Sequence, residues 1–165
     1  MLFLCFKKNQ NGFTLIELVA SLVVLIAILQ TFLFISSSVN SSSLLRDSLI
    51  AANLAQEGIE VVRNIRDRDS LMENSFGASL PDGSWRVQWN SASLLALGGD
   101  PPLKKDPVNK FFSYDTGTDT IFRRTINIFT VSPNEIRAIS TVEWDVKSSS
   151  KSTSAESHLF NWYRP

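Results

Sequence analysis

A long apolar stretch near the N-terminus constrains this chain more than any other feature of its sequence. Residues 13–35 read FTLIELVASLVVLIAILQTFLFI, and Glu17 is the only charged residue among them. As a helix rising 1.5 Å per residue, this stretch spans about 34 Å, which covers the roughly 30 Å hydrocarbon core of a bilayer. We therefore expect residues 13–35 to form a transmembrane helix.

Charge is distributed unevenly around this stretch. The chain has 16 Lys plus Arg and 16 Asp plus Glu, so its formal net charge is zero. Lys7 and Lys8 precede the apolar stretch, and no other basic residue occurs before Arg46. Basic residues favour the cytoplasmic side of a membrane, so we expect the N-terminus inside the cell. The polar remainder has no basic excess, which argues against nucleic acid as a partner.

The length of the apolar stretch and its acidic residue help to distinguish between a secretory signal peptide, a simple signal anchor and a segment with a further role. A secretory signal peptide has an apolar region of only about 7–15 residues. A simple signal anchor accounts for the length and orientation, but not for Glu17. A carboxylate costs about 2.5–3.5 kcal/mol at the bilayer centre and less near the interface. The position of Glu17 therefore predicts a specific partner for its charge.

The residues around Glu17 resemble the class III leader of type IV pilins and type II secretion pseudopilins. From Lys7 the sequence reads KKNQNGFTLIEL. The resemblance implies that a prepilin peptidase cuts between Gly12 and Phe13 and methylates the new N-terminal Phe13. It also implies that Glu17 pairs with the Phe13 amine of a neighbouring subunit during assembly. Lys7 and Lys8 would then belong to a leader that is removed.

The helical pattern resumes beyond the membrane segment, with one polar stripe and two apolar flanks. The stripe consists of Arg46, Asn53, Glu57, Glu60 and Asn64. The flanks are Leu45, Leu49, Ala52, Ala55, Ile59 and Val62 on one side and Ile50, Leu54, Val61 and Ile65 on the other. A sheet of the same chain can cover one flank and neighbouring subunits of a filament the other. The alternative is a core helix enclosed within one domain.

We expect one helix from Phe13 to about Arg66, with two weak points. Serine competes for backbone hydrogen bonds, so residues 36–43 predict a bend or local fraying. Gly58 is the second weak point, since glycine costs about 1 kcal/mol relative to alanine inside a helix. Residues 54–67, LAQEGIEVVRNIRD, also resemble the corresponding region of PilV-like and GspI-like minor pilins.

Beyond about Asp69 the pattern changes from helix to strand. Alternating apolar and polar residues between turn residues predict strands at residues 84–90, 111–114, 120–131, 136–147 and 155–163. Residues 91–110 are expected to form a long connection and residues 148–154 a loose loop. In the strand at 136–147, Ser140 interrupts an otherwise apolar face. The short links favour an antiparallel sheet packed on the C-terminal half of the helix, an α+β architecture.

The expected organisation has four parts: a leader at 1–12, a transmembrane helix at 13–35, an extracytoplasmic amphipathic helix at 36–69 and a β-rich head at 70–165. The resemblance reaches the head only through the FRRTI, VEWDV and FNW segments. Many pilins have a C-terminal disulfide, which the single Cys5 excludes here. Many major pilins have a helix-bending proline, and no proline precedes Pro81. Both departures favour a minor pilin or a pseudopilin.

Catalytic and metal sites are not predicted. The Asp115-Thr116-Gly117 tripeptide matches aspartic proteases, but that chemistry needs two such carboxylates and no second copy exists. This loop and the nearby Asp100, Asp106 and Asp119 lack EF-hand spacing for calcium. His158 is the only histidine, and we interpret it as structural. We expect no enzyme activity, no metal and no cofactor.

Basic and aromatic residues of the head raise the possibility of DNA capture during natural transformation. The candidates are Arg123-Arg124, Lys104-Lys105 and the cluster Arg63, Arg66 and Arg68, with Trp85, Trp89, Trp144 and Trp162. Aromatic residues at a period of two more often fill a core, and the head has no net positive charge. We therefore expect solvated basic residues and buried tryptophans.

These observations predict a structural subunit, a minor pilin or pseudopilin, held in the inner membrane and then assembled into an extracytoplasmic filament at the cell surface. The implied partners are prepilin peptidase, other pilin subunits through the N-terminal helix, the inner-membrane assembly platform and the lipid bilayer. The alternative is a membrane-tethered extracytoplasmic binding module, such as a DNA-uptake pseudopilin, whose head binds a ligand or partner.

Overall fold

A computed structural model describes residues 14–72, 75–147 and 149–162, and for residues 36–41 it describes the backbone alone. The chain divides into two units, Met1–Ser43 and Leu44–Pro165. The predicted boundaries at residues 12, 35 and 69 concern processing and the membrane, and they stay predictions. Lys7, Lys8, Gly12 and Phe13 lie outside the described residues.

One helix, α1 (Leu15–Leu71), contributes to both units. It extends five residues beyond the predicted end at Arg66. Arg68 lies in its last turn, where a positive charge is stabilised by the helix dipole. The backbone stays helical through residues 36–43, so the expected fraying there is wrong. The small propensity penalty of each serine does not outweigh the cooperativity of a long helix. The expected bend stays a prediction.

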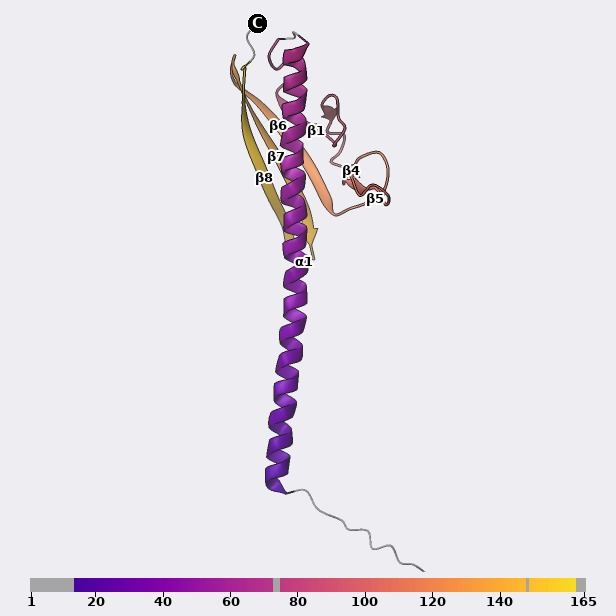
Figure 1. The fold of residues 1–165 in the computed structure, drawn as a ribbon, viewed down its shortest axis with the longest axis vertical. Helices are drawn as coiled ribbons and strands as arrows, with labels where there is room; N and C mark the ends of the chain where they lie inside the picture. The colour runs from indigo at the N-terminus through magenta and orange to yellow at the C-terminus, as the bar shows by residue number, and fades with distance from the viewer. Residues whose placement is uncertain (1–13, 73–74, 148, 163–165) are drawn as a thin grey trace, which may run out of the picture. The chain divides into compact units, whose positions relative to one another are not determined.

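A five-stranded antiparallel sheet packs along the C-terminal half of α1, as predicted (Figure 1). Its strand order is β2-β1-β6-β7-β8. The strands are β1 (Gly83–Arg86), β2 (Leu95–Ala96), β6 (Phe122–Ser132), β7 (Glu135–Val146) and β8 (Ser149–Phe160). The two strands predicted at 120–131 and 136–147 correspond to β6 and β7, which pair along almost their whole length. The α+β architecture is confirmed.

A small second sheet, of strand order β4-β3-β5, lies within the same unit. Its strands are β3 (Lys104–Lys105), β4 (Phe112–Ser113) and β5 (Thr118–Asp119). The prediction at 111–114 therefore contained β4. Residues 91–110, predicted as a connection, include β2 and β3. Strands of two residues are too short to show an alternating pattern, which explains why they were missed.

The loop predicted at residues 148–154 is wrong, because β8 begins at Ser149. This strand pairs with β7 in continuous register from Ser149 to Phe160. It is an edge strand with mostly exposed side chains, so its order comes from backbone hydrogen bonds and needs no apolar alternation. Lys147 adopts a positive φ of 55° at the preceding turn. The strand also ends at Phe160, three residues before the predicted Tyr163.

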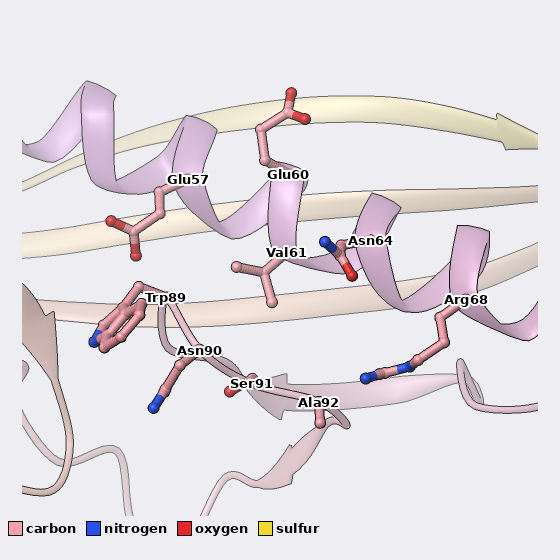
Figure 2. A pocket seen from close by; sticks show the side chains of 9 residues that line it. All are labelled: Glu57, Glu60, Val61, Asn64, Arg68, Trp89, Asn90, Ser91 and Ala92. Carbon is pink, nitrogen blue, oxygen red and sulfur yellow. The ribbon is translucent and has the colours of Figure 1, made fainter.

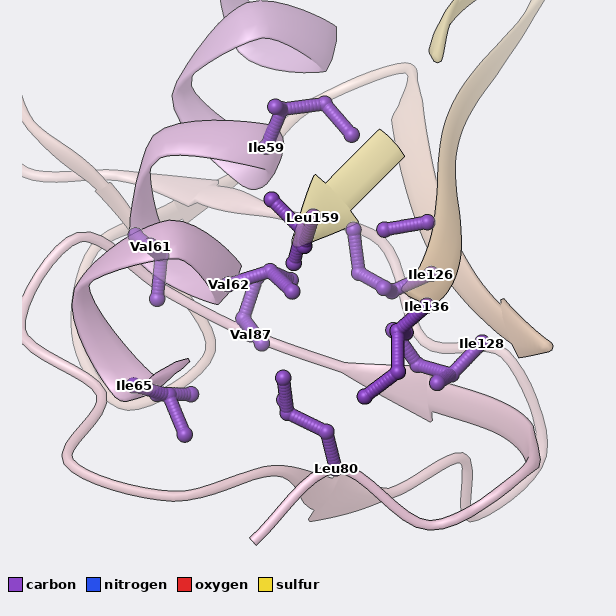
Figure 3. Close-up of a cluster of buried hydrophobic side chains, with 11 residues drawn as sticks. Ile59, Val61, Val62, Ile65, Leu80, Val87, Ile126, Ile128, Ile136 and Leu159 are labelled. Carbon is purple, nitrogen blue, oxygen red and sulfur yellow. The ribbon is translucent and has the colours of Figure 1, made fainter. Parts of the chain in front are cut away.

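The main core encloses both apolar flanks of α1 around residues 59–65. Figure 3 shows side chains of α1 meeting those of the sheet and of the segment around Leu80. From the helix, Ile59 and Val62 of one flank and Val61 and Ile65 of the other are all buried. The alternative of a helix enclosed within one domain therefore describes this region. Leu45 and Leu49, nearer the membrane segment, are exposed.

Gly58 allows a close approach between α1 and the sheet. It is buried, and a Cβ atom at this position would overlap Ser140 Oγ and lie 2.9 Å from Ile126 Cδ1. Ser140 is itself fully buried on the face of β7 that the sequence predicted. The glycine predicted as a weak point of the helix is thus also required by its packing.

Candidate functional site

The membrane-proximal helix begins with a side-chain cap that involves Glu17. Thr14 immediately precedes α1, and its carbonyl accepts hydrogen bonds from the Glu17 and Leu18 amides at 3.1 and 3.2 Å. Glu17 Oε2 in turn accepts from the Thr14 amide and hydroxyl, both at 3.4 Å. Thr-x-x-Glu is the spacing of a capping box. This spacing was visible in the sequence, but the prediction assigned Glu17 only to assembly.

The cap leaves Glu17 able to bind a further donor. An ionised carboxylate has about four acceptor positions on its two oxygens, and both contacts from Thr14 reach Oε2. Among the described residues, Oε1 accepts no hydrogen bond. The carboxylate is also near the positive end of the helix dipole, which stabilises its charge. The helix start therefore holds a carboxylate acceptor of which, within the described part of the chain, one oxygen takes part in capping.

Residues Leu15–Ile35 form a helix that is long and apolar enough to cross a membrane, by length and composition. Its large apolar side chains are exposed. The hydroxyls of Ser21 and Thr31 donate to the carbonyls of Leu18 and Ile28 at 2.9 and 2.8 Å. Since polar groups in lipid must be satisfied within the protein, these internal bonds suit a helix that anchors the chain in a membrane.

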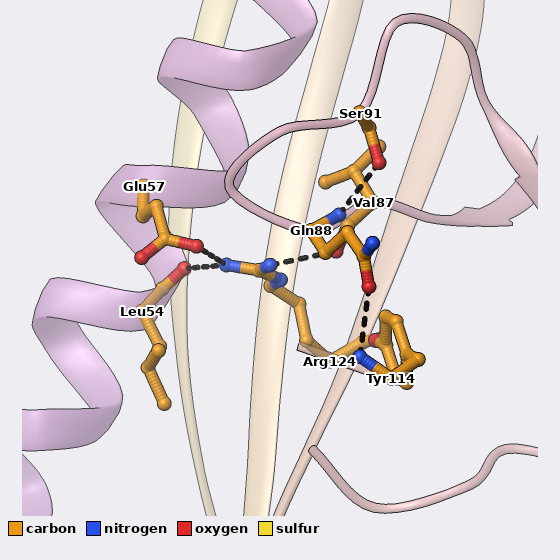
Figure 4. Close-up of polar contacts among 7 residues, drawn as sticks. All are labelled: Leu54, Glu57, Val87, Gln88, Ser91, Tyr114 and Arg124. Carbon is orange, nitrogen blue, oxygen red and sulfur yellow. Dashed lines mark hydrogen bonds and ion pairs between the residues drawn. The ribbon is translucent and has the colours of Figure 1, made fainter. Parts of the chain in front are cut away.

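A buried arginine ties the sheet to α1, and the sequence prediction missed it. Arg124 of β6 is fully buried. Its Nη1 donates to the Leu54 carbonyl at 2.8 Å and to Glu57 Oε1 at 3.0 Å, and its Nη2 donates to the Val87 carbonyl at 2.6 Å (Figure 4). These three bonds join α1, β6 and the segment after β1.

The same cluster continues to the small sheet through Tyr114. Its hydroxyl donates to the Arg124 carbonyl at 3.1 Å, and burial raises the pKa of this phenol. The Tyr114 amide donates to Gln88 Oε1 at 2.8 Å. Gln88 also explains why the strand predicted at 84–90 is shorter than expected and ends at Arg86. Its amide donates to Ser91 Oγ and not to a neighbouring strand.

Two other basic residues proposed for DNA capture, Arg66 and Arg123, also form contacts within the protein. Arg66 is buried and donates to the Phe160 carbonyl at 3.2 Å. Arg123 forms ion pairs with Asp145 at 3.5 Å and Asp100 at 3.9 Å. Together with the full burial of Arg124, these contacts argue against a basic surface for nucleic acid. The prediction of solvated basic residues is wrong for Arg66 and Arg124.

The prediction of buried tryptophans holds for only some of them. Trp144 is buried in a second apolar cluster, against Phe122. Trp89 and Trp162 are 48% and 58% exposed. The prediction was therefore correct for Trp144 and wrong for these two. Trp89 follows the end of β1, so the alternation that suggested an inward side chain no longer applies.

The acidic residues of the head make separate local contacts. Asp115 Oδ2 accepts from Gln88 Nε2 at 2.6 Å. Asp106 Oδ1 accepts from the Asn109 and Val108 amides at 3.0 and 2.7 Å, which lower the pKa of its carboxyl. In the described part of the chain, no three His, Cys, Asp or Glu side chains group in a way that could hold a metal ion.

His158 lies on the exposed edge strand. Its Nδ1 is 2.6 Å from Glu135 Oε1 and its Nε2 is 3.3 Å from Glu156 Oε1. Glu135 belongs to β7 and Glu156 to β8, the strand of His158 itself. The Glu135 contact therefore joins β7 to β8, in the structural role that was predicted for this histidine.

The chain combines an α+β fold with an N-terminal helix whose length and composition suit it to anchoring in a membrane. Residues 7–29 match the family model described as the prokaryotic N-terminal methylation motif. The match spans the segment from Lys7 through Gly12, Phe13 and Glu17 into the apolar helix, and it indicates a prepilin-type N-terminus of the kind found in type IV pilin-like proteins. Comparisons with curated proteins and with solved structures give no match.

Proposed function

We propose that this protein is a minor pilin or pseudopilin, a structural subunit without enzymatic activity. Prepilin peptidase cleaves it after Gly12 and methylates Phe13, and the mature chain joins a type IV pilus-like filament through its N-terminal helix. The observation that carries this proposal is the methylation motif at residues 7–29, which extends into the exposed apolar helix Leu15–Ile35. The resemblance of residues 54–67 to PilV-like and GspI-like proteins supports a minor subunit.

Glu17 is the proposed assembly contact. In lipid, an ammonium and a carboxylate each cost free energy unless they are paired. Oε1 of Glu17 suits the charged amine of Phe13 in a neighbouring subunit, because the Thr14 contacts reach only the other oxygen and no other described residue donates to Oε1. The cap would then orient the carboxylate, and the neighbouring amine would neutralise it.

The proposed route runs from the inner membrane to the cell surface. Lys7 and Lys8 would keep the N-terminus in the cytoplasm, where prepilin peptidase meets the leader. The head would lie outside the cytoplasm, and the inner-membrane assembly platform would move the processed subunit from the bilayer into the filament. Other pilin subunits would replace lipid around residues 15–35.

Two substitutions at Glu17 test the assembly contact and separate it from capping. Glu17→Ala removes both the cap and the charge, whereas Glu17→Gln keeps an acceptor suited to a capping box but removes the charge. We expect both variants to insert and to be cleaved, and both to be depleted from sheared filaments of cells that carry the assembly machinery. Ser21→Ala, within the same helix, is the control and should assemble normally. Normal assembly of Glu17→Gln would refute charge pairing.

A further inference from the structure

Two exposed aromatic side chains contact each other on the head. Trp89 and Phe111 are 48% and 52% exposed, their ring centroids are 5.0 Å apart and their planes are inclined by 32°. Aromatic side chains usually bury much of their large area, so an exposed pair suggests a binding surface. We refer to Trp89 and Phe111 as the aromatic pair.

The aromatic pair stands among three pockets. Trp89 lines one of about 390 Å³, in which it faces side chains of α1 (Figure 2). Trp89 and Phe111 together line a second of about 160 Å³. Phe111 also lines a third of about 250 Å³ against the helix, near Ile50 and Leu54. Binding sites for small molecules are typically concave, with aromatic walls and a few polar groups.

Both aromatic residues are presented by tightly hydrogen-bonded turns. The turn around Trp89 is closed by the Gln88 amide to Ser91 Oγ and by the Ser91 amide to the Gln88 carbonyl, both at 2.9 Å. Phe111 ends a loop in which its carbonyl accepts from the Asp106 amide at 3.0 Å. A site whose parts are already held in place loses little conformational entropy on binding.

Polar groups without partners surround the aromatic pair. Asn64 of α1 lines the larger pocket and Asn109 lines the second. Among the described residues, neither side-chain amide forms a hydrogen bond, and the indole N–H of Trp89 has no acceptor. Asp106 also lines the second pocket, and its amide contacts, by lowering the pKa of its carboxyl, keep it ionised as an acceptor. The surface therefore offers donors and acceptors beside exposed aromatic faces.

We propose that the aromatic pair and its pockets form a binding site for a neutral oligosaccharide. A pyranose ring has an apolar C–H face that packs on an aromatic ring, and its hydroxyls both donate and accept hydrogen bonds. Asn64 and Asn109 supply amides for these hydroxyls in the two pockets that Trp89 lines, and Asp106 supplies a carboxylate.

The charges lining the pockets favour a neutral ligand. The two pockets that Trp89 lines contain the carboxylates of Glu57, Glu60, Asp106 and Asp115 and a single basic residue, Arg68. Glu57 and Glu60 form ion pairs with Arg124 and Arg63. The remaining carboxylates of Asp106 and Asp115 would repel a phosphate backbone, and an acidic glycan likewise. A buried protein–protein contact would favour aromatic residues together with few charges at its centre, and the four carboxylates of these linings do not fit that pattern.

The test uses the full chain in a zwitterionic detergent that carries no sugar. Cellohexaose and chitohexaose are titrated by calorimetry into the parent protein and into Trp89→Ala, Asn109→Ala and Trp162→Ala. The last is the matched control, because Trp162 is similarly exposed and lines none of the three pockets. We expect binding of at least one hexasaccharide, weakened about tenfold or more by Trp89→Ala, weakened by Asn109→Ala and unchanged by Trp162→Ala.

Three outcomes would overturn the proposal. The first is no binding of either hexasaccharide to the parent protein. The second is an equal loss in Trp89→Ala and Trp162→Ala, which would show nonspecific contact with exposed tryptophan. The third is unchanged saccharide binding in Trp89→Ala together with altered self-association, which would make the pair a subunit contact. If Trp89→Ala does not fold, the binding of Asn109→Ala decides the test, and unchanged affinity in that variant would overturn the proposal. The proposal does not depend on assembly into a filament.

Discussion

Gly58→Ala offers a sharp test of how α1 packs on the sheet. In an exposed helix interior, replacing glycine by alanine stabilises by about 1 kcal/mol. Here the new Cβ would overlap Ser140 Oγ and lie 2.9 Å from Ile126 Cδ1 and 3.2 Å from Arg124 Cδ. Overpacking of this kind costs about 1–3 kcal/mol. With three crowded contacts we take the upper end, and the net expected loss of stability is about 2 kcal/mol.

The assay is urea unfolding of the full chain in detergent, followed by tryptophan fluorescence. All four tryptophans lie after residue 80, so the signal reports the head and not the membrane helix. Gln56→Ala, at an exposed position of the same helix, is the control and should change stability by less than about 0.5 kcal/mol.

A second substitution identifies the cause of the loss. Among the described residues, Ser140 Oγ is buried without a hydrogen-bond partner, so Ser140→Ala alone should be neutral or slightly stabilising. In the double variant the overlap with Oγ is gone, and we expect recovery of at least about 1 kcal/mol as a coupling between the two sites. If Gly58→Ala is more stable than the parent protein, or if the two substitutions are additive, the close approach at Gly58 is wrong.

Two further substitutions probe the head by other means. Glu57→Gln should lower the unfolding free energy by about 3–5 kcal/mol, because it leaves the fully buried Arg124 guanidinium without its ion-pair partner. Glu60→Gln, whose ion pair with Arg63 is exposed, should cost less than about 1 kcal/mol, and equal effects would contradict the buried ion pair. Gly117→Ala should speed deuterium exchange in β3 and β5 but not in β6–β8, since Gly117 has a φ of 123° and a Cβ there would lie 2.5 Å from the Lys105 carbonyl oxygen. Unchanged exchange in β3 would refute the close approach.

Sequence reasoning predicted those parts of the fold in which the spacing of apolar residues matches the pattern of buried side chains. The helix, β6 and β7 all show this, and even Ser140 was placed on the correct face. The edge strand β8 was partly missed because its serine-rich first half is exposed and paired only through its backbone. The two-residue strands are defined by long-range pairing, which leaves no local pattern.

The buried arginine and the helix cap could both have been predicted from the sequence. Arg124 alternates in phase with Phe122, Ile126 and Ile128 of β6, all of them buried, so the period of two already placed it on the inner face. A charged residue in such a position needs a partner, and Glu57 on the polar stripe of α1 supplies it. Trp89 could not be placed from sequence, because its exposure depends on the turn that Gln88 and Ser91 close.

Intact-mass analysis and N-terminal sequencing of the protein, isolated from cells that contain prepilin peptidase, test the central claim most directly. Processing at the proposed site removes residues 1–12, including Lys7 and Lys8, and adds one methyl group. The proposed function predicts a mature chain that begins with N-methylated Phe13. A chain that still begins with Met1 would contradict it and would favour an uncleaved, membrane-tethered binding module.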